Sequence, residues 1–160
     1  MLPEFVGSFM NTLSFQKASE IAAGTRLTAR KTSTNPIAVA VLDSGGHLIV
    51  LEREDGAAFM RPPIAIGKAW GALGLGVGTR ALETRLTNVP ESAPFFASIA
   101  ALTSGNLIPV PGGVLITEGA DNTIIGAVGV SGDTSDKDEA CAVGGIEAAE
   151  LVAAVGVRNQ

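Results

Sequence analysis

The sequence predicts an α/β fold of the α+β kind, in which an antiparallel sheet of about five strands is flanked by helices. Two pairs of short apolar segments, each joined by a turn containing glycine and aspartate, are typical of β-hairpins. Segments with helical spacing of apolar residues precede, separate and follow these hairpins. Hairpins in place of strand–helix–strand crossovers indicate antiparallel pairing. Because 160 residues is the size of one ordinary domain, we expect a single domain over residues 14–160 behind an N-terminal arm of residues 1–13.

The first helix is predicted to begin after Ser14, because serine is a favourable N-cap residue. Apolar and small residues follow at helical spacing, and charged residues occupy the opposite face. Pro36 disfavours helix at the residue before it, so we expect the helix to end near residues 32–35. The positions predicted to face the core are Phe15, Ala18, Ile21, Ala22, Thr25 and Ala29.

The first hairpin is predicted from two β-rich segments, residues 37–42 and residues 47–53. The sequence Asp-Ser-Gly-Gly at residues 43–46 separates them. Glycine adopts the positive φ values of tight turns without steric cost, so this sequence is a strong turn signal.

A second long helix is predicted over residues 59–75. Its glycines Gly67, Gly71 and Gly74 fall at spacings of four and three, which leaves one helical face without side chains. Each glycine costs about 1 kcal/mol in a helix interior. We therefore expect this face to lie where the sheet, another backbone or a flat ligand comes close.

The remaining chain is predicted to hold two helices, a further segment that is helix or turn, and the second hairpin. The helices are residues 79–88 and residues 135 to about 155, and the helix or turn is residues 92–103. The hairpin strands are residues 114–117 and 123–130. Acidic residues gather at the start of the last helix, where the helix dipole favours negative charge.

Composition limits the classes of partner. Charged residues make up 17% of the chain, below the roughly 25% of average soluble domains. This indicates that other copies of the chain cover part of the surface, so we predict a homo-oligomer. The net charge of −5 and the scarcity of aromatic residues argue against nucleic acid as a partner.

Neither a membrane nor an oxidising compartment is indicated. The most apolar run, residues 64–77, is shorter than the roughly 20 residues that span a bilayer. The first ten residues lack the basic and apolar regions of a secretory signal, which makes the cytoplasm the expected location. Cys141 is the single cysteine and is expected to be a small buried residue.

Four stretches, in this order and spacing, carry a family resemblance: AVAVLDSGGHLIVLEREDGA, PPIAIGKAWGAL, PVPGGVLI and GAVGVSGDTSDKDEACAVGGIEA. Together they resemble the GlcG/HbpS-like family of haem-binding and haem-degrading-domain proteins from about residue 14 to residue 155. The resemblance implies a profilin-like arrangement of sheet and helices, assembled as dimers to octamers. It also implies a small-molecule or tetrapyrrole ligand, with haem as the candidate cofactor, and a role in haem handling or redox sensing.

His47 is the candidate metal ligand, since it is the one histidine of the chain. Neutral imidazole is a common ligand of haem iron, and the neighbouring Gly45 and Gly46 leave room for a flat macrocycle. The alternative is a histidine at a strand end whose ring bonds to a neighbouring backbone group.

Lys68 and Arg53 are candidate partners of a ligand's carboxylates. Lys68 interrupts a nearly apolar helix, so it requires either an anionic ligand or a buried carboxylate, Asp43 or a glutamate. The segments containing Gly112, Gly113 and Ser131 offer backbone amides to the same ligand, although turn geometry alone would also explain them.

Catalysis is the alternative function. Asp43, His47 and Lys68 are the candidate catalytic residues of an isomerase, lyase or hydrolase acting on a small acid. An accessory protein of a catabolic pathway is also compatible with the sequence. These hypotheses all require a cavity where the first β-turn meets the glycine-bearing helix.

Overall fold

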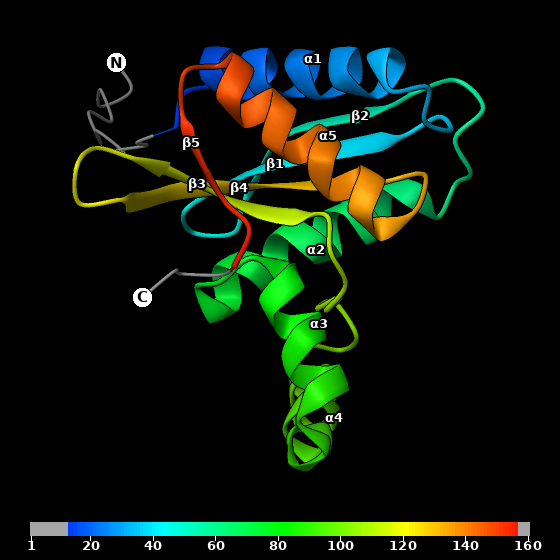
Figure 1. Ribbon diagram of the computed structural model, residues 1–160, viewed down its shortest axis with the longest axis vertical. Coiled ribbons are helices and arrows are strands. Elements are labelled where there is room, and N and C mark those ends of the chain that lie inside the picture. Colours follow the sequence, from blue (N-terminus) through cyan, green and yellow to red (C-terminus); the bar gives the residue numbers. More distant parts are fainter. Residues whose placement is uncertain (1–12, 157–160) are drawn as a thin grey trace, which may run out of the picture.

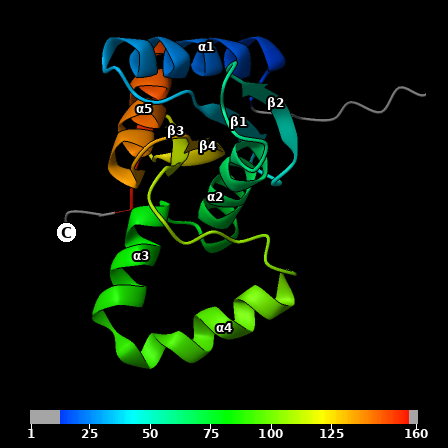
Figure 2. The same cartoon turned by 90° about the vertical axis from the view of Figure 1, so that its right-hand side faces the viewer.

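The computed structural model describes residues 13–156, and its elements lie in three layers (Figure 1). Helices α1 and α5 cover one face of the sheet, and α2 covers the other. Helices α3 and α4 extend away from the sheet beyond α2 (Figure 2). The helices are α1 (Phe15–Lys31), α2 (Arg61–Leu75), α3 (Thr79–Asn88), α4 (Ala93–Leu102) and α5 (Ser135–Ala148), with a 3₁₀ turn at Pro90–Ser92 before α4.

The sheet has five strands in the order β2-β1-β4-β3-β5, and every neighbouring pair is antiparallel. The predicted α+β class with an antiparallel sheet is therefore confirmed. The strands are β1 (Ala38–Asp43), β2 (Leu48–Arg53), β3 (Gly113–Glu118), β4 (Thr123–Ser131) and β5 (Val152–Ala154). Both hairpins form as predicted, and their inner strands β1 and β4 pair with each other at the centre of the sheet.

The two faces of the sheet have different side chains. Toward α1 and α5 the strands present branched residues such as Val41, Ile116 and Val128. Toward α2 they present mainly small residues, which pack against the alanines of that helix. At Gly129 a β-carbon would lie 1.8 Å from the carbonyl oxygen of Ala65, so α2 approaches the backbone of β4 directly. Because both of their faces are buried, the central strands appear in the sequence as unbroken apolar runs.

Helix α1 begins as predicted, with the Ser14 hydroxyl accepting a hydrogen bond from the backbone N–H of Lys17 at 3.1 Å. The predicted inward positions from Ala18 to Ala29 are buried, whereas Phe15 is exposed. Leu13, the last residue of the expected N-terminal arm, is 1% exposed and belongs to the core. The rest of that arm, residues 1–12, lies outside the described residues.

The glycine face of α2 is covered by a loop of the chain at Gly67 and Gly71 and is open at Gly74. A β-carbon on Gly67 would lie 2.9 Å from the carbonyl oxygen of Asn106, and the backbone N–H of Ile108 donates to the carbonyl oxygen of Gly67 at 3.3 Å. Leu107 lies against Gly71 in the same way. Of the alternatives that the spacing left open, another backbone is the one that occupies this face.

The last helix is shorter than predicted, because α5 ends at Ala148 instead of near residue 155. Glu150 adopts a left-handed conformation with φ +60°, and residues 152–154 then pair with β3 as strand β5. The alanine-rich segment has a high helical propensity. Pairing with the otherwise open edge of β3 overrides it, since an unpaired edge leaves backbone groups without partners.

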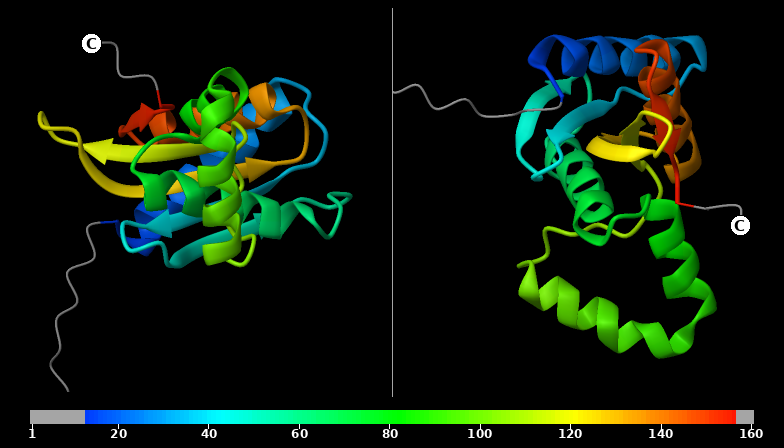
Figure 3. Two further views of the ribbon diagram at one scale, coloured as in Figure 1. Left: turned by 90° about the horizontal axis from the view of Figure 1, so that it is seen from below. Right: turned by 90° about the vertical axis from the view of Figure 1, so that its left-hand side faces the viewer.

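Helices α3 and α4, with the turn between them, form what we call the helical projection, residues 79–102. Figures 2 and 3 show it reaching away from the three layers, with α4 farthest from the sheet. Its own small core joins Leu82, Phe96 and Leu107. Within residues 13–156, no helix is both long and apolar enough to cross a membrane.

Candidate functional site

His47 stands at the turn between β1 and β2 and is open to solvent, with 81% of its side chain exposed. Its Nδ1 lies 3.3 Å from Oδ1 of Asp43. The same carboxylate oxygen accepts the backbone N–H groups of Gly45 and His47 at 2.9 and 3.0 Å. Asp43 therefore shapes the turn and orients the imidazole, and a ring held through Nδ1 presents its other nitrogen away from the turn. Carboxylate–histidine pairs of this kind are common next to metals.

A small cleft adjoins this turn, at the place where the first β-turn meets the glycine-bearing helix. It has a volume of about 160 Å³ and lies between residues 44–46 and α2. Trp70 forms one wall, so close to Gly46 that a β-carbon there would lie 3.2 Å from the indole nitrogen. Leu73 and Gly74 complete the helical side. Neither His47 nor Lys68 is among the described residues that line this cleft.

Lys68 is 2% exposed and makes a buried ion pair with Asp138, with Nζ and Oδ2 2.9 Å apart. The expected carboxylate partners, Asp43 or a glutamate, are thus corrected to Asp138. The physical reason is that Asp138, in the first turn of α5, lies within reach of the Lys68 side chain next to Gly112. The other oxygen of Asp138 accepts the backbone N–H of Asp133 at 3.0 Å. Lys68 therefore joins α2 to the start of α5.

Gly112 and Gly113 lie against Lys68, and Ser131 follows Val130, whose backbone N–H donates to the carbonyl oxygen of Gly112 at 2.9 Å. A β-carbon on Gly112, whose φ is +119°, would lie 2.9 Å from Nζ of Lys68. The backbone N–H of Gly113 donates to the hydroxyl of Thr79 at 2.9 Å. The Ser131 hydroxyl accepts a hydrogen bond from Arg61 at 3.3 Å. The Gly113 amide and the Ser131 hydroxyl are therefore engaged within the chain.

The candidate site residues fall into two groups at opposite ends of the sheet. Asp43 pairs with Gly126 on β4, whereas Ser131 pairs with Ala38 at the other end of β1. Five residues of strand separate the two positions on β4, roughly 17 Å. Arg53 also pairs with Ala38, so it lies at the end of β2 away from His47. The structure brings together Lys68, Gly112, Gly113 and Ser131, and it leaves Asp43 and His47 apart from them.

A second ionic cluster joins the helical projection to α5. Arg80 donates to Glu139 at 2.7 Å and to Asp136 at 2.5 Å. These hydrogen bonds, the one to Asp136 foremost, raise the pKa of the Arg80 guanidinium above its ordinary value. Thr79 and Asp138 have structural roles that our sequence analysis missed. A lysine on an apolar helix indicated that a buried carboxylate was needed. The sequence did not point to Asp138, because acidic residues at the start of α5 are also explained by the helix dipole.

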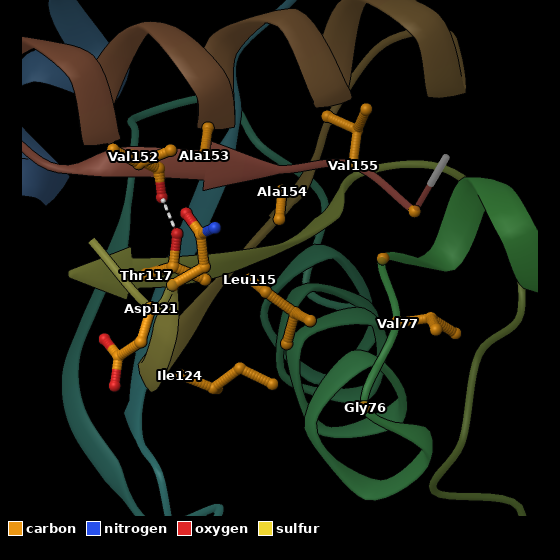
Figure 4. Close-up of a pocket in the computed structure, with 13 residues that line it drawn as sticks. Gly76, Val77, Leu115, Thr117, Asp121, Ile124, Val152, Ala153, Ala154 and Val155 are labelled. Atoms are coloured by element: carbon orange, nitrogen blue, oxygen red, sulfur yellow. Dashed lines mark hydrogen bonds between the residues drawn. The ribbon is translucent and has the colours of Figure 1, made fainter. Parts of the chain in front are cut away.

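A larger cleft, of about 520 Å³, was not predicted from the sequence (Figure 4). It lies between the turn after α2 at residues 76–78, the outer strands β3 and β5, and the β3–β4 turn. Leu115, Ile124 and Ala154 form its apolar floor. It contains none of the candidate residues. Across the described part of the chain, no group of three or more histidine, cysteine or acidic side chains is placed to hold a metal ion.

The chain matches the family model described as "Haem degrading protein HbpS-like" over residues 13–147. It belongs to the HbpS-like family. Protein GlcG of Escherichia coli strain K12 is 37% identical over 119 residues, covering 74% of this chain and 81% of GlcG. The family resemblance of the four sequence stretches is thereby confirmed.

Solved structures share the fold of this HbpS-like chain. The crystal structure of a PduOC:heme complex superposes with a TM-score of 0.76 at 24% identity, covering 87% of this chain and 96% of that one. The Klebsiella pneumoniae protein ORFY gives 0.75 at 25% identity, covering 91% and 95%. A crystal structure of HbpS gives 0.70 at 26% identity, covering 90% and 93%. The fold is therefore that of the family throughout the described chain.

Proposed function

We propose that this chain binds haem as its small ligand, with His47 as the residue that would hold the iron. The observation that supports this most is the imidazole itself, which is open to solvent and held through Nδ1 by Asp43. The neighbouring Gly45 and Gly46 add no bulky side chains to the approach, and Trp70 offers an aromatic wall. Bound haem would supply the iron on which haem handling or redox sensing depends.

Family membership supports the same proposal. The family model carries haem degradation in its description, and one structural neighbour is a complex with haem. In this chain the contribution of the protein would be to hold and orient the imidazole, since a histidine paired with a carboxylate is a more basic ligand.

The size of the cleft beside His47 limits how much of a tetrapyrrole it could enclose. Its volume of about 160 Å³ is smaller than the roughly 300–1,000 Å³ of pockets that enclose a small ligand. This cleft would therefore not enclose a tetrapyrrole. His47 and Trp70 are the residues that would hold it at the surface of the turn.

Haemin titration tests the proposal directly. We expect a Soret band that saturates at one haemin per chain, together with quenching of Trp70, the single tryptophan. His47→Ala should lower the affinity at least tenfold and shift the band, whereas Lys137→Ala, a change at a half-exposed residue of α5, should do neither. An identical band and affinity in His47→Ala would contradict the assignment of the ligand.

The alternative of an isomerase, lyase or hydrolase has less support from the geometry. Lys68 is enclosed in its ion pair with Asp138, and His47 is open to water. The three candidate catalytic residues therefore do not converge on one enclosed site, which general acid–base catalysis favours.

We also propose that the chain is a homo-oligomer assembled through the helical projection. Helix α4 has apolar residues all around its axis, and Ser98 is its one polar residue. A helix of this kind is normally buried on all sides. Phe96 is buried against the small core of the projection, yet Phe95 is 39% and Leu102 83% exposed. No charged residue occurs between Glu91 and Glu118. A second copy covering α4 would bury this surface.

A further inference from the structure

The 520 Å³ cleft beside β5 is a separate feature from the His47 turn, and its origin lies in the length of α2. That helix covers the inner strands and ends at Gly76, which has a left-handed conformation with φ +69°. The chain then turns away into α3. Strand β5 and the end of β3 beside it are consequently left without a helix over this face of the sheet (Figure 4).

The floor of the cleft is apolar and continuous with the core under α2. Leu115 is 3% exposed, and Ile124 and Ala154 pack against the same cluster. Leu115 and Ala154 are paired across β3 and β5, so their side chains lie on one face of the sheet. The volume falls within the range of about 300–1,000 Å³ typical of small-molecule sites. An apolar body of the size of an aromatic ring therefore has a place to bind.

The rim of the cleft is polar and carries negative charge. Thr117 donates its hydroxyl hydrogen to the carbonyl oxygen of Val152 at 3.1 Å, so it meets a ligand only as an acceptor. Asp121 is the one charged residue among the described residues that line the cleft. The hydroxyl of Thr123 donates to Asp121 at 2.8 Å, and this hydrogen bond lowers the pKa of the carboxyl. Asp121 is therefore ionised at neutral pH.

We propose that this cleft is a binding site for a small organic ammonium compound, with an apolar body on Leu115, Ile124 and Ala154 and the cationic head toward Asp121. A carboxylate of the same shape is disfavoured, because the described lining offers it no cation and places Asp121 at the rim. The propionates of haem meet the same repulsion. The site is thus distinct in place and in charge preference from the proposed haem site at His47.

Three probes of similar shape test the proposal on the whole chain: phenethylammonium, 2-phenylethanol and phenylacetate. Binding is followed by the amide resonances of Gly76, Gly78 and Ala154 in two-dimensional NMR spectra. We expect these resonances to shift with phenethylammonium, more weakly with the alcohol and least with phenylacetate. No shift at these amides with phenethylammonium, or equal binding of phenylacetate, would overturn the proposal.

Asp121→Asn separates charge recognition from the apolar contact. Because Asp121 is exposed, its charge is screened, and we expect the preference for phenethylammonium over the alcohol to fall by about two- to fivefold. Glu147→Gln, a change at an exposed acid on α5, is the matched control and should leave the preference unchanged. A preference that survives Asp121→Asn would contradict the role of the carboxylate.

Ala154→Leu fills the floor and should abolish binding of all three probes, with folding checked by its amide spectrum. His47→Ala should leave phenethylammonium binding intact, and Asp121→Asn should leave haemin binding intact. Failure of the haem proposal and failure of this one are therefore distinguishable.

Discussion

The three-layered body of this protein and its helical projection bury apolar side chains in different ways. In the body, the central strands β1 and β4 are covered on both faces, and residues such as Ile116 and Val128 are fully buried. In the projection, Phe96 is buried on one side of α4 while Leu102 on the same helix is 83% exposed. The central strands are therefore buried within one chain. Helix α4 is buried on one side alone, which supports the proposal that a second copy covers its outer surface.

The largest expected effect is in the body, at the ion pair between Lys68 and Asp138. Lys68→Ala leaves the carboxylate of Asp138 buried without its partner, which typically costs about 3–5 kcal/mol of unfolding free energy. Urea denaturation followed by circular dichroism measures it. Lys137→Ala removes a half-exposed lysine from α5 and should change stability by less than about 0.5 kcal/mol. Similar losses for both variants would contradict the structural role of Lys68.

A smaller but still large loss is expected for Ile116→Ala on β3. Its side chain is fully buried between the sheet and the α1–α5 layer. Truncation removes buried methyl and methylene groups and leaves a cavity, at a cost of about 2–5 kcal/mol. The same urea titration provides the value. A change below about 1 kcal/mol would mean that the body is less tightly packed than the structure indicates.

Phe96→Ala should act locally within the helical projection. Phe96 packs with Leu82 and Leu107 in a small cluster that borders the core under α2 at Trp70. We expect a loss on the order of 2 kcal/mol, seen as faster amide hydrogen exchange over residues 79–107 and unchanged exchange in α1. Equal acceleration in α1 would show that the projection and the body unfold as one unit.

The smallest effect on stability is expected for Leu102→Gln at the end of α4. The side chain is 83% exposed in the single chain, so the unfolding free energy of the monomer should change by less than about 0.5 kcal/mol. The oligomer should nevertheless weaken, which light scattering measures as a lower mass. Leu27→Gln replaces an exposed leucine of α1 and is the control. A monomeric mass for the unmodified chain would refute the proposed assembly.

Most of the fold could be predicted from sequence because local signals and tertiary packing agree there. The Ser14 cap, the glycine-containing turn after β1 and the apolar runs of the central strands all form as expected. The exception is β5, where a helix-favouring segment pairs with the edge of β3. Helical propensity does not depend on an open strand edge far away in the chain, so the sequence predicts helix for this segment.

The candidate site was harder to predict because its residues depend on which ends of the strands meet. The need of Lys68 for a carboxylate was visible in the sequence, but its partner Asp138 lies 70 residues away. The cleft near Gly46 was expected, whereas the larger cleft beside Ala154 was not. That cleft forms because α2 ends before it covers the whole width of the sheet. The spacing of residues along the sequence does not encode how far a helix reaches across a sheet.

The contrast between the two sheet faces has a consequence for sequence divergence. On the α2 side, Gly129 and Ala65 are in backbone contact, so any larger residue at Gly129 would push the helix off the sheet. On the α1–α5 side, the branched residues fill space, and shortening them leaves holes. A saturation library should therefore reject enlargement on one side and truncation on the other. Among homologues, we therefore expect residues on the α2 side of a strand to stay small and residues on its α1–α5 side to stay large.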